Sequence, residues 1–185
     1  MQRHVRAPVV LAASLFAVFS IAAQGEEFTA RLSGFNEIGA LNSTTQTGAL
    51  LSTGSAKVKV SLDRNAKTAT YTVTYSGLSN GVTQGHIHFG KNHVPGGVIV
   101  FFCSNLGNGP AGTPACPANA GTVTGTWTAA SVVGPAAQNI AAGDFDGLVA
   151  ALTSNTAYAN LHTAKFPAGE IRGQMQRAER EDDDD

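Results

Sequence analysis

The chain has 185 residues, of which 43% are hydrophobic and 14% charged, with a formal net charge of −1 and two cysteines. This length suits a single domain that can bury its own core without a dense set of disulfides. The body of the chain is nearly neutral and has no basic stripe, which argues against nucleic acid as a partner.

The first 23 residues have the three-part plan of a secretory signal peptide. Arg3 and Arg6 give a positive start, an apolar run follows from Val9 to Ala23, and small residues close it. A membrane-spanning helix needs about 20 apolar residues, so the run is short for an uncleaved anchor, which is the alternative. We therefore expect residues 1–23 to be removed, leaving a secreted or periplasmic protein with no membrane span.

Most of the remaining chain is predicted to form short antiparallel strands. Period-two alternation with β-branched and aromatic residues is clearest at residues 56–62 and 70–75. Further strands are expected at residues 28–32, 86–89, 98–102, 122–128, 158–163 and 170–176. Gly-rich turns between short strands favour a sandwich or a barrel. The fold class is therefore all-β, in one domain over residues 26–177.

Three segments depart from the strand pattern. Residues 36–53 are rich in Gly, Ser and Thr and are expected to form a loop or an edge strand with a loop. Residues 143–152 predict one short helix, with Asp144 or Asp146 as its N-cap. Residues 178–185 are predicted to be an acidic, disordered tail.

The two cysteines, Cys103 and Cys116, flank a stretch rich in Gly, Pro and Asn. Such a stretch is a loop, and in an oxidising compartment two cysteines most simply form one disulfide. The alternative is a pair of thiolate metal ligands. The disulfide is favoured because the Cys-x-x-Cys spacing of many metal sites is missing.

The histidines carry the strongest functional signal. His86 and His88 are one residue apart in a predicted strand, so both imidazoles project from the same face. Alternation in the strand at residues 158–163 places Tyr158, Asn160 and His162 on one polar face. If the two strands share a sheet, the three histidines gather on one side of it. Imidazole nitrogens suit copper, zinc, iron or nickel.

The last predicted strand adds two charged residues to this face. A short turn joins it to the strand before it, so the two are expected to pair as a hairpin. Alternation would place Glu170 and Arg172 on the polar side, where they could form an ion pair or orient an imidazole. His93, in the turn after His88, is a candidate fourth ligand without the support of a strand.

Three blocks of the sequence together resemble the CHRD domain, a module named from chordin and also found singly in secreted bacterial proteins. They are residues 28–37, residues 85–88 with residues 95–100, and residues 158–163 with residues 167–174. The chain departs from the family pattern after Glu37, where the usual proline-containing turn is missing, and the cysteine loop looks like a local addition. The resemblance implies an immunoglobulin-like, Greek-key β-sandwich or barrel and no settled activity.

A second, shorter resemblance concerns the metal. Residues 85–90 are similar to the copper-ligand strand of copper-zinc superoxide dismutases, although the rest of that family's metal loop has no counterpart here. The leading hypothesis is a metal site formed by His86, His88 and His162, with copper as first choice and zinc as second. Copper(II) leads the affinity order of divalent ions for nitrogen sites.

Two alternatives to a metal-binding domain stay open. The polar face could be a hydrogen-bonded network in a structural module, or in one that binds another extracellular protein. An enzyme similar to superoxide dismutase would need an open copper position, with Arg172 steering the anion. The sequence contains no Gly-x-Ser-x-Gly motif and no phosphate-binding loop, so nothing else indicates catalysis, and no particular oligomeric state is predicted.

Overall fold

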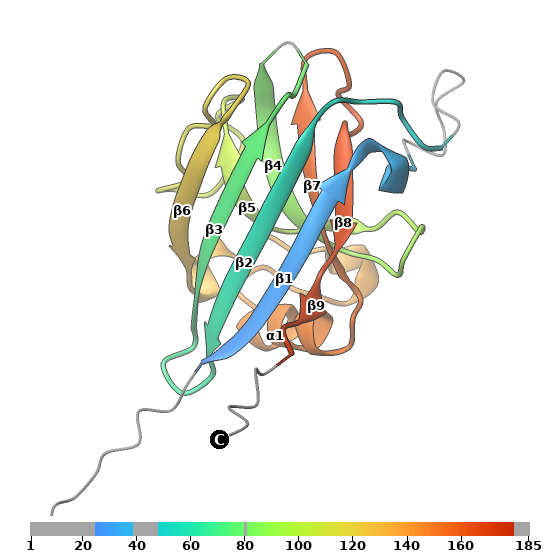
Figure 1. Cartoon of the computed structure of the whole chain (residues 1–185). Helices are drawn as coiled ribbons and strands as arrows, with labels where there is room; N and C mark the ends of the chain where they lie inside the picture. Colours follow the sequence, from blue (N-terminus) through green and yellow to red (C-terminus); the bar gives the residue numbers. More distant parts are fainter. Residues whose placement is uncertain (1–24, 39–47, 80, 180–185) are drawn as a thin grey trace, which may run out of the picture.

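The computed structural model describes residues 25–38, 48–79 and 81–179 (Figure 1). The predicted signal peptide, residues 1–23, lies outside the described residues. So do residues 180–185 of the predicted acidic tail.

The described part of the chain forms nine strands and one α-helix, which confirms the all-β prediction. The strands are β1 (Glu26–Ser33), β2 (Ser55–Asp63), β3 (Thr68–Ser76), β4 (Val82–Phe89), β5 (Gly97–Ser104), β6 (Gly121–Trp127), β7 (Ala157–Thr163), β8 (Ile171–Gln174) and β9 (Gln176–Arg177). The helices are α1 (Phe145–Thr153) and three short 3-10 turns, η1 (Gly34–Asn36), η2 (Ala129–Ser131) and η3 (Ala136–Gln138).

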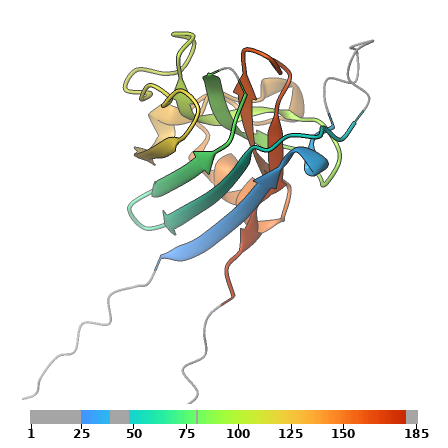
Figure 2. The same cartoon turned by 45° about the horizontal axis from the view of Figure 1, so that its top comes forward.

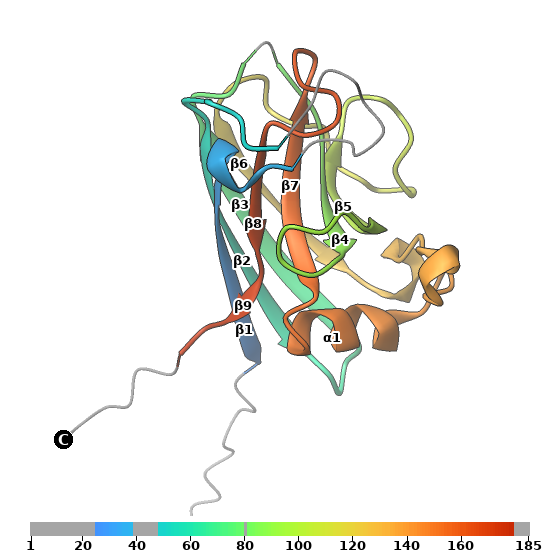
Figure 3. The ribbon, with the colours of Figure 1, turned by 90° about the vertical axis from the view of Figure 1, so that its right-hand side faces the viewer.

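All the strand pairs are antiparallel, in the order β5-β4-β7-β8-β1-β2-β3-β6, with β9 paired to β1. We call β6-β3-β2-β1 the front sheet and β8-β7-β4-β5 the rear sheet. The two sheets face each other in Figure 3. They join where Ser33 of β1 pairs with Arg172 of β8.

No strand ladder forms between the opposite edges, β5 and β6, and side chains of β6 and of the neighbouring β3 reach β5 instead. Trp127 Nε1 donates a hydrogen bond to Phe101 O at 2.7 Å, and Tyr71 Oη donates to Phe102 O at 2.8 Å. The sheet is therefore a nearly closed barrel, and its inward-facing side chains are shielded from water along both seams.

The core lies between the two sheets and follows the predicted alternation. Val60 and Val73 of the front sheet and Ile87 and Leu161 of the rear sheet are fully buried. Helix α1 lies at the lower end of the two sheets in Figures 1 and 3, and its buried side chains extend the same core. Burying such side chains supplies the main favourable free energy of folding, at about 25 cal/mol per Å².

Helix α1 begins two residues later than its predicted start. The Asp144 side chain accepts a hydrogen bond from Gly147 N at 2.9 Å, which identifies Asp144 as the N-cap. Asp146, the other candidate, forms an ion pair with Lys67 at 3.0 Å. The predicted strand at residues 170–176 is also divided, since Met175 separates β8 from β9 and its N–H bonds to Ala157 O.

Cys103 and Cys116 form the predicted disulfide, with their Cα atoms 5.1 Å apart. The bond ties the end of β5 to the returning loop. Asn105 strengthens the same connection, because its side chain hydrogen-bonds to both the N–H and the C=O of Cys116. The loop is thus fixed to the edge of the rear sheet.

The outer faces of the two sheets differ in exposure. Along β2 and β3, the outward residues are exposed apart from the half-buried Ser61 and Thr68, whereas every residue of β7 is buried. The chain between β4 and β5 crosses over β7 in Figure 3, and the hairpin turn between β7 and β8 folds onto the same face. Gly96 permits this close return, because a Cβ at that position would overlap Phe89 O.

Candidate metal centre

Three histidines meet on the outer face of the rear sheet. The ligand atoms that His86, His88 and His162 can offer all lie within 4.8 Å of one another. The antiparallel pairing of β4 with β7 brings them together, since His86 pairs with Asn160 and His88 with Tyr158. The prediction that the two strands share a sheet is therefore correct, and His162, which pairs with Gln84, lies diagonally across the strands from His86.

The strand that carries the histidine pair is irregular on its other side. The register of β4 against β5 shifts between Gly85 and His86 and again between Ile87 and His88. Bulges re-aim side chains and are common beside functional sites. The edge of Phe101, on β5, packs against His86 with ring centroids 4.4 Å apart. The ring of His86 is therefore fixed by packing as well as by strand geometry.

Backbone carbonyls orient two of the imidazoles. The Nδ1 atom of His88 lies 2.9 Å from Gly96 O, and that of His162 lies 3.0 Å from Pro167 O. A carbonyl only accepts hydrogen bonds, so each Nδ1 carries the proton and each Nε2 keeps its lone pair. This arrangement is typical of metal-ligating histidines, whose second nitrogen usually donates to a carbonyl or a carboxylate.

His86 completes the cluster. Its Nδ1 lies 3.2 Å from His162 Nε2, which fits an N–H of His86 donating to the lone pair of His162. The Nε2 atoms of His86 and His88 are buried and have no hydrogen-bond partner. Buried polar atoms are nearly always paired, so the two unpaired lone pairs indicate a missing partner.

All three imidazoles are neutral at pH 7. Burial lowers the pKa of His86 to about 2, that of His88 to about 3 and that of His162 to about 4. The charge of the neighbouring imidazoles lowers the pKa of His86 and His88 further. A proton therefore does not compete for these lone pairs, whereas a divalent cation can use them.

The spacing of the cluster fits a metal ion after a small adjustment. Bonds of about 2.0–2.1 Å place ligand nitrogens about 3–4 Å apart. His86 Nδ1 and His162 Nε2 are 3.2 Å apart, which shows that the two rings approach within this range, although His86 Nδ1 carries a proton. The ligand atoms that the three histidines can offer lie up to 4.8 Å apart, which exceeds it. One ring must move inward by about 1 Å for all three to bind one ion.

A column of stacked side chains supports His88. The Tyr158 ring is parallel to the His88 ring, with centroids 4.8 Å apart, and the Arg172 guanidinium lies 3.4 Å from the Tyr158 centroid. Arg172 also donates to Lys91 O and Val94 O at 3.0 Å each. Arg172 therefore fixes the covering segment and, through Tyr158, the position of a candidate ligand.

Asn160 occupies the same face but bonds away from the imidazoles. Its Nδ2 donates to Glu37 Oε2 at 2.6 Å and to Ile171 O at 2.9 Å. Glu37 is a buried carboxylate that sequence reasoning did not assign to the site. Glu37 comes just after η1 and outside any strand, so strand alternation could not predict which face its side chain joins. Its hydrogen bond to Asn160 places it beside the cluster.

A model of the CHRD domain family matches residues 28–175, which include all of these side chains. The chain belongs to the CHRD domain family. Searches of curated proteins and of solved structures gave no match. The family assignment confirms the resemblance inferred from the three sequence blocks.

Glu170 lies elsewhere in this CHRD domain, and the expected ion pair with Arg172 is wrong. Its carboxylate accepts hydrogen bonds from Ser52 Oγ at 2.6 Å, from Thr163 Oγ1 at 2.7 Å, and from the N–H and hydroxyl of Ser79 at 3.1 Å. Thr163 is on the core side of β7, opposite to His162. Glu170 precedes β8, where the chain still turns, so strand alternation does not apply to it.

His93 is also separate from the cluster, contrary to its candidacy as a fourth ligand. It is exposed in the turn after β4, with a left-handed φ of 58°, and the group of three histidines does not include it.

Within residues 25–38, 48–79 and 81–179, no helix of the CHRD domain is long and apolar enough to cross a membrane.

Proposed function

We propose that this CHRD domain binds a transition-metal ion through His86, His88 and His162. The observation that carries the proposal is the pair of buried Nε2 atoms, on His86 and His88, that have no hydrogen-bond partner within a group of three histidines. Leaving a buried acceptor unpaired costs about 1–3 kcal/mol each. A bound cation would remove that cost at both atoms.

Copper is the preferred ion and zinc the second choice. Both cysteines are consumed by the disulfide, so the described ligand set is entirely nitrogen. For such a set the affinity of divalent ions peaks at copper(II). The domain itself contributes neutral imidazoles, fixed tautomers and a covering that keeps water away from the buried nitrogens. Burial of the ligand atoms favours retention of an ion over turnover of a substrate.

The same proposal includes secretion or export to the periplasm. The signal-like plan of residues 1–23, the disulfide and membership of the CHRD family all support it. Disulfides persist in oxidising compartments and are rare in the cytosol. N-terminal sequencing of the exported protein would test it, and a mature N-terminus near Gln24–Glu26 is expected.

A metal-free structural role is the competing function, because one observation favours it. The bond between His86 Nδ1 and His162 Nε2 already satisfies two of the ring nitrogens at 3.2 Å. In that case the histidines would act as a register-fixing network on the rear sheet. A ligand that binds only the folded state raises stability by mass action, so unfolding experiments separate the two functions.

The decisive experiment titrates chelator-stripped protein with copper(II) and with zinc while the thermal midpoint and the bound stoichiometry are measured. We expect one ion per chain. A free ion concentration of 100 times Kd should raise stability by about 2.7 kcal/mol, or about 5–10 °C for a domain of this size.

The variant that carries both His86→Ala and His162→Ala should lose this binding. His93→Ala, the matched exposed histidine, should bind as the wild type does. Stoichiometric binding that survives the double substitution would exclude the three-histidine site, and a thermal midpoint unmoved by either ion would favour the structural role.

A further inference from the structure

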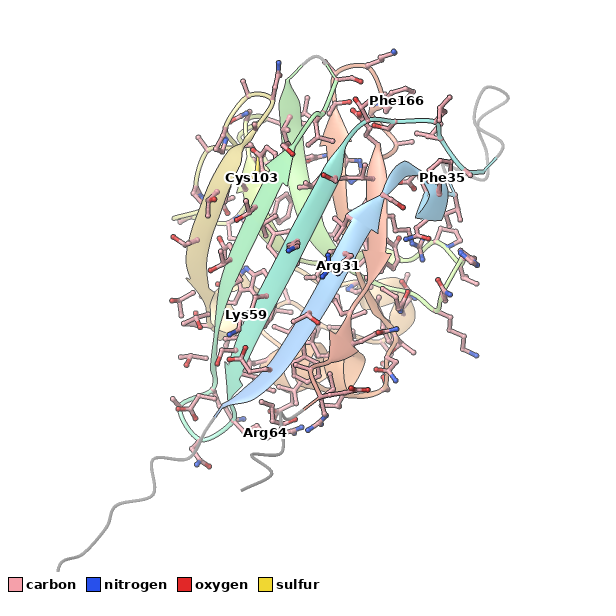
Figure 4. All side chains as sticks on the ribbon, in the orientation of Figure 1. Arg31, Phe35, Lys59, Arg64, Cys103 and Phe166 are labelled. Carbon is pink, nitrogen blue, oxygen red and sulfur yellow. A yellow bond between two sulfur atoms is a disulfide. The ribbon has the colours of Figure 1, made fainter. Side chains whose placement is uncertain are left out.

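The outer face of the front sheet presents an ordered grid of polar side chains. Across β3 and β6, threonines pair directly on the exposed face: Thr70 with Thr126, Thr72 with Thr124 and Thr74 with Thr122. Beside them, Lys57 and Lys59 of β2 pair with Thr74 and Thr72. Arg31 and Thr29 of β1 then pair with Lys57 and Lys59. Figure 4 shows Arg31 and Lys59 standing on this face.

The three cations of this grid are incompletely neutralised. Lys59 forms an ion pair with Glu27 at 2.8 Å. Among the described residues, Arg31 and Lys57 have no carboxylate partner. The two cations also lie directly opposite each other across the strands. Like charges in directly opposed positions destabilise a sheet. Their placement therefore lowers stability unless an external anion occupies the space between them.

A shallow groove follows the same residues. It has a volume of about 330 Å³, and its lining includes Thr29, Arg31, Lys57, Lys59 and Thr72. Neighbouring strands are about 4.8 Å apart, and alternate residues of one strand about 6.7 Å apart. The cations thus form a flat triangle, with hydroxyl groups that can both donate and accept hydrogen bonds beside it.

We infer that this face, the Arg31–Lys57–Lys59 triangle with its threonine border, binds an acidic polysaccharide. Sulfate or carboxylate groups of the polymer would lie between the cations, and its hydroxyl groups would bond to the threonines. The inference is independent of the metal site, which lies on the opposite sheet. Two polymer types share the required chemistry, one carrying sulfate and one carrying carboxylate.

The makeup of the face disfavours other polyanions. The exposed large hydrophobic residues of the described chain, such as Phe35, Leu51 and Val94, are all off the grid, so it offers nothing to insert into a lipid surface. It also presents no exposed aromatic ring on which a nucleic-acid base could stack. Threonine hydroxyls beside cations match a polymer that carries both hydroxyl groups and charge.

The test measures binding of the purified, chelator-treated protein to heparin and to alginate, as sulfated and carboxylated probes, with neutral dextran as control. We expect binding to at least one acidic polymer, loss of binding as NaCl is raised to 1 M, and no binding to dextran. The variant with Arg31→Gln and Lys57→Gln should bind about tenfold more weakly, as the loss of two exposed ionic contacts predicts.

A matched variant removes the same charge elsewhere. Lys91→Gln with Lys165→Gln changes two exposed lysines over the rear sheet and should alter affinity by less than about twofold. Equal losses in both variants, or none in the first, would overturn the proposal. So would tighter binding to phosphatidylglycerol vesicles or to single-stranded DNA than to either polysaccharide. Thermal midpoints no lower than that of the wild type would show that both variants are folded.

Discussion

The outer face of the front sheet is open to water, whereas the outer face of the rear sheet is buried beneath two chain segments. Strands β4, β7 and β8 of the rear sheet share with the front sheet an alternation of apolar inward and polar outward residues. In the front sheet the outward residues are threonines and solvated lysines. In the rear sheet they are histidines, Tyr158, Asn160 and Arg172, all buried.

The difference shows how one pattern can yield two kinds of surface. Alternation decides which side chains share a face, but covering segments decide the dielectric environment of that face. Beneath the covering, imidazoles lose their charge and hydrogen bonds become specific and costly to break. A buried polar face is therefore suited to holding an ion, and an open one to contacting a large solvated partner.

The largest expected difference between the two sheets is the loss of folding stability in acid, which comes from the buried histidines of the rear sheet. The pKa values of His86, His88 and His162 are lowered by burial to between about 2 and about 4, against about 6.5 when unfolded. Above pH 6.5 both states are neutral and the histidines add no pH dependence. As the pH falls below 6.5, the unfolded state binds protons first, so stability falls until the folded-state values are reached.

Each buried histidine should contribute about 1.4 kcal/mol per pH unit to this loss. Urea unfolding of the chelated protein between pH 7.5 and 5.0 measures the slope, which should decrease by about a third in His88→Gln. His93→Gln, at the exposed turn, is the control and should keep the wild-type slope. A flat profile from pH 7.5 to 5.0 would contradict the burial of the rear face.

The second comparison uses one arginine from each sheet. Arg172→Ala should lower the free energy of unfolding by about 3 kcal/mol, because it removes two charge-assisted hydrogen bonds to the covering segment and the contact with Tyr158. Arg31→Ala, on the open face, should change it by less than about 0.5 kcal/mol. Urea unfolding at pH 7.5 measures both, and similar losses would mean that the two faces are equally solvated.

The smallest effect concerns single hydroxyl groups. Tyr158→Phe keeps the ring on His88 but loses the hydroxyl that accepts from Gly96 N at 3.1 Å, which should cost about 1 kcal/mol. Thr74→Val loses the exposed bond to Thr122 at 3.0 Å and should cost less than about 0.5 kcal/mol. Thermal unfolding of the two variants compares them, and the reverse order would show that the covering over Tyr158 is loose.

Much of the candidate site could be predicted from the sequence because strands impose a period of two. His86, His88 and His162 were placed on one face by counting alone, and the structure brings them together. The same counting failed for Glu170, which precedes its strand and turns to Ser52, Ser79 and Thr163. Counting also could not predict where the side chain of His93 points, because residues in a turn have no fixed period.

The sequence by itself determined four features: the strands, the short helix, the disulfide and the shared face of three histidines. Each follows from local geometry or from the pairing of the two cysteines. The burial of that face was decided only by the tertiary structure. Arg172, Tyr158 and His88 fix the segment between β4 and β5 over β7, and Glu37 docks on Asn160 from far along the chain. These contacts join residues distant in sequence, and local periodicity carries no information about such contacts.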